Sequence, residues 1–194
     1  MDKVPELVFV MSGKRKSGKD YVASLMCNRI GKHLCSSVQL SGPLKKQYAE
    51  DHNLNFEKLM DSSEYKEKFR IDMIKWGEDK RTEDPGFFCR LSTSKNDLKK
   101  IWIITDARRK TDVEYFKENY KGRTFTVRVC AKESIREWRG FTFTPGVDDA
   151  ESECGLDEGV NWDYFIHNNG DQDQLDKDID CLVTIVREKL CDVT

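Results

Sequence analysis

The strongest constraint on this chain is an apolar run that leads directly into a basic loop framed by two glycines. Residues 7–11 read Leu-Val-Phe-Val-Met, and residues 12–20 read Ser-Gly-Lys-Arg-Lys-Ser-Gly-Lys-Asp. The run has the character of a buried strand, and the loop has the spacing G-x-x-x-x-G-K, in which successive backbone N–H groups surround one anion. A helical pattern follows, with Val22, Met26 and Ile30 on one face. This context favours a phosphate-binding loop over a solvated basic turn, which is the alternative.

The residues of this loop have distinct expected roles. Gly13 and Gly18 allow the backbone to curl, and the helix that opens at Lys19 adds the positive end of its dipole. Lys19 reaches the β- and γ-phosphates of a nucleotide, and Asp20 stands where Ser or Thr normally faces Mg²⁺. We expect the nucleotide phosphates to be held by Gly13, Lys14, Arg15, Lys16, Ser17, Gly18, Lys19 and Asp20.

Strand-type and helix-type patterns alternate along the chain. The apolar runs that predict strands lie at residues 6–11, 37–40, 101–105, 124–129 and 164–166. The periodicities that predict helices lie at residues 19–32, 44–50, 62–80, 112–120, 133–139 and 172–190. This alternation predicts an α/β P-loop three-layer fold, in which a parallel sheet is flanked by helices.

We expect residues 1–194 to form a single domain with two specialised segments. The segment from about 45 to 90 is mostly helical between two strands, which predicts an acceptor-binding insertion over the binding edge of the sheet. The segment from about 132 to 159 predicts a lid, because residues 139–159 are charged and hinged by glycines. Loops of this length are uncommon in compact domains unless they are functional. A disordered loop is the alternative.

Composition excludes several classes of function. The chain has 33 Lys and Arg against 35 Asp and Glu, so there is no overall charge that favours nucleic acid. No apolar stretch approaches the length of a membrane span. Seven cysteines without a C-x-x-C pair indicate thiols in a reducing compartment. The last residues, Asp192-Val193-Thr194, are not a peroxisomal signal. We therefore expect a cytosolic, monomeric protein with a small-molecule partner.

Two features follow the strand at residues 101–105. Asp106 occupies the place of a Walker-B-type acid that assists Mg²⁺, although a helix cap or a turn residue is equally compatible with this position. Arg108 and Arg109 come next, where ligands of open α/β sheets bind, and guanidinium groups bind phosphate or carboxylate with two hydrogen bonds. These residues predict a small polyanionic acceptor.

Arg136 and Arg139 flank the start of the expected lid. Phosphoryl transfer depends on positioning and charge neutralisation, and an arginine that swings onto the transferred group can supply part of both. The alternative is a cation that faces the dipole of its own helix. No general base is evident, which fits a phosphate acceptor better than an alcohol, because phosphate is largely ionised at neutral pH.

On these residues the chain resembles the animal-type phosphomevalonate kinases over nearly its whole length. The matching segments are SGKRKSGKD at 12–20, LSGPLK at 40–45, DPGFFCR at 84–90, the turn at 106–109 and FTPGVDDAESECGLD at 143–157. The resemblance implies the nucleoside monophosphate kinase fold. It also implies transfer of the γ-phosphate of ATP, with Mg²⁺, to (R)-5-phosphomevalonate, giving mevalonate 5-diphosphate and ADP in isoprenoid and sterol synthesis.

The resemblance also implies roles for individual residues. Lys19, Asp20 and Arg139 are expected to act in catalysis, and Asp20 and Asp106 are expected near the metal. The ATP contacts implied beyond the loop are Arg139, Asn169 and Gln174. The substrate contacts implied are Arg108, Arg109, Asn168, Lys45, Arg81 and Arg90.

Three other interpretations remain open from the sequence. One is a nucleoside monophosphate kinase or another small-molecule kinase on the same fold. A second is a nucleotide-dependent switch, although the strand end at Asp106 lacks D-x-x-G and the chain has no N-K-x-D guanine motif. A third is a pseudokinase, because Asp20 departs from the common motif. Turnover with a small acceptor distinguishes an enzyme from the last two.

Overall fold

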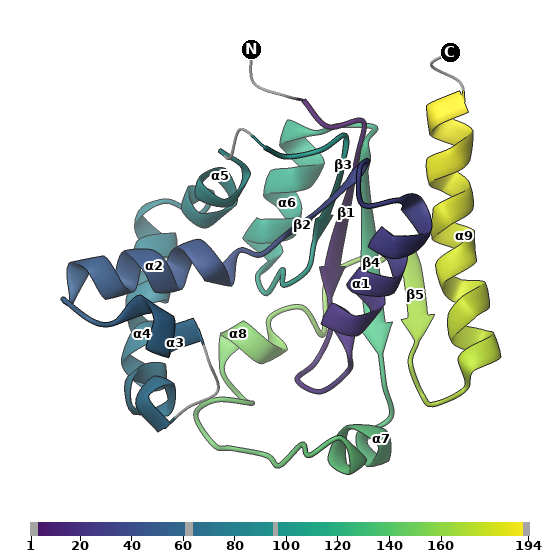
Figure 1. Ribbon diagram of the computed structural model, residues 1–194. Helices are drawn as coiled ribbons and strands as arrows, with labels where there is room; N and C mark the ends of the chain where they lie inside the picture. Colours follow the sequence, from purple (N-terminus) through teal and green to yellow (C-terminus); the bar gives the residue numbers. More distant parts are fainter. Residues whose placement is uncertain (1–3, 61–63, 95–96, 192–194) are drawn as a thin grey trace.

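The computed structural model describes residues 4–60, 64–94 and 97–191 (Figure 1). Its strands are β1 Leu7–Ser12, β2 Cys35–Val38, β3 Ile101–Ile104, β4 Thr124–Cys130 and β5 Tyr164–His167. Its helices are α1 Lys19–Ile30, α2 Ser41–Asp51, α3 Phe56–Met60, α4 Glu64–Glu83, α5 Phe87–Thr93, α6 Lys110–Asn119, α7 Glu133–Trp138, α8 Glu151–Cys154 and α9 Gln172–Cys191.

The strands form one parallel sheet in the order β2-β3-β1-β4-β5. Strand β1 lies in the middle, with Phe9 opposite Ile103 of β3 and Phe125 of β4. Because every strand runs in the same direction, the loops that leave their carboxyl ends gather at one edge of the sheet. The predicted α/β P-loop fold is confirmed, and this edge is where the site residues meet.

Helices cover both faces of the sheet, which gives the three layers. On one face, Phe9 and Met11 of β1 pack in a cluster with residues of α1 and α9, among them Met26 and Ile179. On the other face, β1 contributes Val8 and Val10 to a cluster that includes Phe116 of α6. Both faces of β1 are thus buried, which explains why its sequence is a continuous apolar run.

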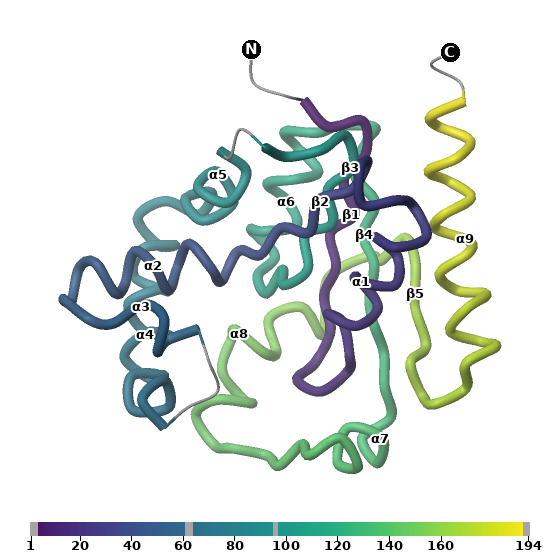
Figure 2. Tube along the Cα trace, in the orientation of Figure 1, coloured from purple at the N-terminus to yellow at the C-terminus, as the bar shows by residue number. Residues whose placement is uncertain are grey.

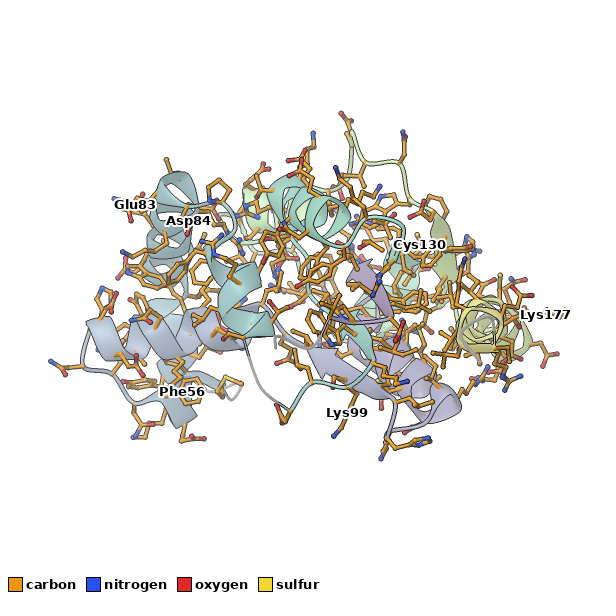
Figure 3. All side chains as sticks on the ribbon, turned by 90° about the horizontal axis from the view of Figure 1, so that it is seen from above. Phe56, Glu83, Asp84, Lys99, Cys130 and Lys177 are labelled. Carbon is orange, nitrogen blue, oxygen red and sulfur yellow. The ribbon has the colours of Figure 1, made fainter. Side chains whose placement is uncertain are left out.

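Helices α2 to α5 form a separate helical lobe beyond the β2 edge of the sheet (Figures 1 and 3). In Figure 3, Phe56, Glu83 and Asp84 of this region lie at the end of the molecule opposite Lys177 of α9. Tyr48 and Leu59 are buried in the lobe and pack with Trp76. The predicted insertion is therefore helical, but its first helix starts at Ser41 rather than at residue 44, and α3 and α5 were not predicted. The start of the predicted helix at 62 lies outside the described residues.

The chain between β4 and β5 crosses the carboxyl edge of the sheet, below the strands in Figure 2. It contains α7 and the short helix α8, which was not predicted. The loop between them is ordered by its own hydrogen bonds, since Asp148 accepts from the backbone N–H of Thr144 at 2.8 Å. Among the described residues, no helix is long and apolar enough to cross a membrane.

Candidate active site

The loop after β1 has the close approaches that its glycines predict. A Cβ added to Gly13 would lie 2.8 Å from the carbonyl oxygen of Val129, and one added to Gly18 would lie 2.3 Å from Nδ2 of Asn168. Gly18 has a φ of 83°, and Lys16 has a positive φ of 65°. Only glycine fits at the two framing positions without displacing a neighbour, so the loop keeps its anion-binding curvature.

Ser17 provides an independent sign that the loop binds an anion. Its backbone N–H donates to the carbonyl oxygen of Lys14 at 3.0 Å, and its hydroxyl oxygen is buried without a hydrogen-bond partner in the described part of the chain. A buried polar atom without a partner is costly, and a phosphate oxygen would satisfy it. The residues of the loop therefore fit the phosphates of ATP.

Lys19 and Asp20 open helix α1 at the end of the loop. The ammonium group of Lys19 lies 2.9 Å from a carboxylate oxygen of Asp20, whose side chain is 69% exposed. Such a carboxylate is free to meet a hydrated ion, and Mg²⁺ is commonly held by one or two carboxylates together with phosphate oxygens. Asp20 fits this role, and no cluster of three or more potential metal ligands occurs in the described ranges.

Asp106 has a different environment from Asp20. It is 4% exposed, and its two carboxylate oxygens accept hydrogen bonds from the backbone N–H groups of Leu40 and Ser41 at 2.7 and 3.0 Å. It therefore caps the start of α2 from the end of β3. This is the helix-cap role that the sequence left open. Contact of Asp106 with Mg²⁺ stays a prediction.

Arg139, directly after α7, lies against the phosphate-binding loop. Its guanidinium donates to the carbonyl oxygens of Ser17 at 3.1 Å and Lys16 at 3.4 Å, and to the backbone and side-chain oxygens of Asn168 at 3.0 and 3.1 Å. The structure thus brings the predicted lid arginine to the loop. Asn168 also belongs to this nucleotide side, because its amide donates to the Ser17 carbonyl at 2.9 Å.

Asn169 and Gln174 differ in their distance from this arrangement. The side chain of Asn169 accepts from the backbone N–H of Lys132 at 2.8 Å, which joins the end of β5 to the start of the lid. Gln174 is exposed on the outer side of α9, where its amide donates to Asp178 at 2.7 Å. The structure connects Asn169 to the site but gives Gln174 no contact with the loop.

A pocket of about 180 Å³ lies between α2, α4, the turn after β3 and the segment predicted as a lid. The turn is joined to the nucleotide side, because the N–H of Ala107 donates to the carbonyl oxygen of Met11 at 3.1 Å. The apolar part of its lining includes Leu44, Met73, Ile74 and Val147. Its cationic lining consists of Lys45, Lys66, Arg70, Arg81, Arg108 and Arg109.

Asp112 organises one wall of this pocket. Its side chain is fully buried, and one carboxylate oxygen accepts from the backbone N–H groups of Arg108 and Arg109 at 2.9 and 3.0 Å. The other oxygen accepts from the guanidinium of Arg81 at 2.8 Å. Asp112 thereby fixes the positions of three predicted substrate residues. Its position three residues after Arg109, in the first turn of α6, was a signal that the sequence offered.

The arginines of the pocket are already paired with carboxylates. Arg109 donates from two nitrogens to both carboxylate oxygens of Glu78 on α4. Arg108 pairs with Glu153 of α8 and donates to the carbonyl oxygen of Ser152 at 3.1 Å. Burial lowers the pKa of Lys45, and the positive charge of Lys66 lowers it further. The six cationic side chains that line the pocket outnumber its three carboxylates, Glu78, Asp106 and Glu153, so the lining has a net positive charge.

Three acidic side chains of the lid, Asp148, Glu153 and Asp157, contact cations of the site, and we call them the lid carboxylates. Asp148 lies 3.3 Å from Arg15, and Asp157 pairs with Lys14. Glu153 makes the contact with Arg108 described above. One segment of chain therefore holds cations on both the nucleotide side and the pocket side.

Arg90 is not brought into the pocket. It pairs with Asp84 at the start of the loop before α5, and its side chain is about half exposed. Lys66 and Arg70 do line the pocket but were not assigned a role by sequence reasoning. Their spacing of four residues puts both on one face of α4, which was a usable signal.

The fold and the site are those of a P-loop phosphotransferase with a cationic pocket at the turn after β3. Two solved structures share the fold with a TM-score of 0.51. They are TT1252 from Thermus thermophilus, 15% identical over 96% of this chain and 98% of the other, and a gluconokinase from Sinorhizobium meliloti, 9% identical over 99% of both chains.

Sequence comparison gives the family. The phosphomevalonate kinase family profile matches residues 11–122. A Drosophila melanogaster protein named phosphomevalonate kinase is 38% identical over 178 residues, which cover 89% of this chain and 93% of the fly protein. The chain belongs to the phosphomevalonate kinase family.

We predict that Gly18→Ala weakens ATP binding strongly, because the new methyl group displaces Asn168 from the loop. Gly122→Ala is a matched control, since Gly122 has a similar φ of 74° but open space around its Cβ position. Both variants carry the strain of a positive φ, roughly 1–2 kcal/mol. Steady-state kinetics with varied ATP should show a raised KM only for Gly18→Ala. An equal rise in the KM for ATP in both variants would mean that backbone strain, and not displacement of Asn168, weakens ATP binding.

We predict that Asp112→Asn lowers the free energy of unfolding by about 3–5 kcal/mol, because it leaves the buried Arg81 contact without its counter-charge. Urea denaturation followed by fluorescence measures this change. The surviving folded enzyme should show a larger rise in the KM for the acceptor than in the KM for ATP. Glu114→Gln, at an exposed position on the same helix, should change neither quantity. A stable variant with an unchanged KM for the acceptor would contradict the role given to Asp112.

Proposed function

We propose that the residues at the carboxyl edge of this sheet transfer the γ-phosphate of ATP to the phosphate of (R)-5-phosphomevalonate. The products are mevalonate 5-diphosphate and ADP, a step of the mevalonate pathway. The observation that carries the proposal is the cationic pocket, because the turn that lines it is joined through Ala107 to Met11 of β1, the strand that leads into the phosphate-binding loop. Family membership supports the same reaction.

The nucleotide side of the site holds the phosphates. ATP supplies the transferred phosphoryl group when it is bound. Backbone N–H groups between Gly13 and Lys19 surround the phosphate chain, and Lys19 neutralises charge on the terminal phosphates. Arg139 is already held at the rim of the loop by the carbonyl oxygens of Lys16 and Ser17. A small rotation of its guanidinium gives the group in transfer a second cation.

The main requirement on the acceptor side is to offset charge repulsion, not to remove a proton. The acceptor phosphate has a second pKa near 6, so it is largely dianionic at neutral pH and needs no general base. Its approach to ATP is opposed by like charge, and Arg108, Lys45 and Arg81 offset this repulsion. The apolar side of the pocket, which includes Met73 and Val147, suits the hydrocarbon part of a small acid.

Mg²⁺ is part of the proposal. Asp20 would meet the ion, through a water molecule or directly, from the first turn of α1. Asp106 would act mainly by holding α2 and its Lys45 in place, since both oxygens of its carboxylate accept backbone hydrogen bonds. Asn168 would support the loop and Arg139 instead of touching the acceptor. Arg90 and Gln174 are the assignments with the least structural support.

We also propose a monomer in the cytosol, formed as one domain with the helical lobe and the lid as its moving parts. None of the seven cysteines forms a disulfide, which fits a reducing compartment. Residues 192–194, which were compared above with a peroxisomal signal, lie outside the described residues. Sedimentation of the purified protein measures the oligomeric state.

The function is tested by release of ADP from Mg-ATP with four acceptors: 5-phosphomevalonate, mevalonate, AMP and CMP. We expect turnover with 5-phosphomevalonate alone. Turnover with AMP or CMP would support phosphoryl transfer but would contradict 5-phosphomevalonate as the acceptor. ATP binding without turnover would identify a pseudokinase.

Asp20→Ala should lose most turnover while its melting temperature stays near that of the wild type.

We predict that Lys45→Arg changes the pH dependence of kcat/KM for the acceptor. Because its pKa is lowered, Lys45 loses its charge at a lower pH than an ordinary lysine, whose pKa is 10.5. We therefore expect kcat/KM of the wild type to fall as the pH rises through the lowered pKa of Lys45. Arginine stays charged over the same range. The ratio of kcat/KM for Lys45→Arg to that for the wild type should therefore rise with pH. Ionisation of the acceptor affects both enzymes equally and so cancels in this ratio. A ratio that does not change with pH would contradict a role of the Lys45 charge in binding the acceptor.

A further inference from the structure

Two cysteines lie against each other away from the active site. Cys27 is in the last part of α1, and Cys35 is the first residue of β2. Their sulfur atoms are 2.8 Å apart. Cys35 is buried at 7% exposure, and Cys27 packs against the same apolar cluster from a partly exposed position.

The backbone holds the two thiols in this arrangement. Gly31, with a φ of 107°, ends α1 by donating its N–H to the carbonyl oxygen of Cys27 at 3.0 Å. The carbonyl oxygen of Gly31 then accepts from Leu34 at 3.0 Å and from Cys35 at 3.2 Å. The turn between the cysteines is thus tied to both of them. An S–S bond could form here with little movement of the chain.

The two thiols differ in their acidity. The hydrogen bond from Cys35 lowers the pKa of Cys27, and the charge of Lys32 lowers it further, against the effect of burial. The same hydrogen bond, together with burial, raises the pKa of Cys35. Cys27 is also the more exposed of the two. Since the thiolate is the reactive form, Cys27 is the attacking group and Cys35 is the resolving group.

We propose that Cys27 and Cys35 form a reversible dithiol–disulfide site that reacts with small disulfides of the glutathione type. The thiolate of Cys27 attacks one sulfur of glutathione disulfide, which breaks its S–S bond and releases one glutathione thiolate. Cys35 then loses its proton and attacks the Cys27 sulfur of the mixed disulfide, which releases the second glutathione. The protein loses two hydrogens as its thiols are oxidised, and one glutathione disulfide is reduced to two thiols.

The second step becomes easier because of the first. In the reduced protein, the proton of Cys35 is retained by the hydrogen bond to Cys27, by burial and by the negative charge of the Cys27 thiolate. Formation of the mixed disulfide removes the charge and weakens the hydrogen bond. Cys35 is then in contact with the sulfur that it attacks. The mixed disulfide should therefore be short-lived, and the internal disulfide should accumulate.

This site is independent of the proposed reaction. In the described part of the chain, no side-chain hydrogen bond or ion pair joins Cys27 or Cys35 to a residue assigned to ATP or to the acceptor, and the new bond would join α1 to β2. It should restrict the unfolded chain and so raise the melting temperature. Reduced Cys27→Ser should keep the phosphomevalonate-dependent turnover of the wild type, which also shows that the variant is folded.

The test uses the full chain with C181S and C191S, which removes two exposed cysteines of α9 that would bind glutathione. After incubation with glutathione disulfide, intact mass spectrometry should show the loss of two hydrogens and no retained glutathione. Peptide mapping should place the cross-link between Cys27 and Cys35, and dithiothreitol should reverse it together with the rise in melting temperature.

Two matched variants in the same background complete the test. Adding Cys35→Ser should stop the reaction at a stable glutathione adduct on Cys27, whereas adding Cys27→Ser should leave Cys35 unmodified. A stable adduct on Cys27 with Cys35 intact would overturn the proposal, because Cys35 would then fail as a resolving thiol. Unreacted Cys27 and Cys35, or a cross-link to another cysteine, would overturn it as well.

Discussion

The acceptor side of this protein depends on one buried carboxylate. Asp112 has no exposed surface, so its charge requires partners, and it finds them in two backbone N–H groups of the turn after β3 and in Arg81 of α4. These contacts join the core sheet to the helical lobe at the point where the pocket forms. The directions in which Arg108 and Arg109 leave the turn, and the position of Arg81, all follow from this single group. A second carboxylate, Asp106, fixes α2 in the same way.

The site as a whole is built around an excess of positive charge that the protein must stabilise without its substrates. Glu78 pairs with Arg109, and the lid carboxylates pair with Arg108, Arg15 and Lys14. This arrangement explains how a chain with a net charge of −2 presents a cationic pocket. The chemistry requires cations that are close together but kept from repelling one another, and carboxylates at their outer sides meet that requirement.

Much of this protein could be predicted from local sequence patterns. The loop from Gly13 to Lys19 and the central strand were recognisable because each is specified by adjacent residues. The pairing of Asp112 with Arg81 and of Glu78 with Arg109 could not be predicted, because 31 positions of the chain separate the two residues of each pair. The start of α2 was misjudged for the same reason, since its cap comes from Asp106, in the turn after β3. Arg90 lies outside the pocket for a different reason. An arginine suited the pocket by its charge, but Arg90 pairs outside the pocket with Asp84, six residues earlier in the chain.

The lid carboxylates also affect the relation between the two substrates. Asp148 and Asp157 contact the nucleotide loop, and Glu153 contacts an arginine of the acceptor pocket, within one stretch of chain. A phosphate that displaced the carboxylates from either set of cations would change the contacts of this stretch of chain. The two binding equilibria would then share a free-energy term, and by thermodynamic linkage ATP would change the affinity for the acceptor by the same factor by which the acceptor changes the affinity for ATP.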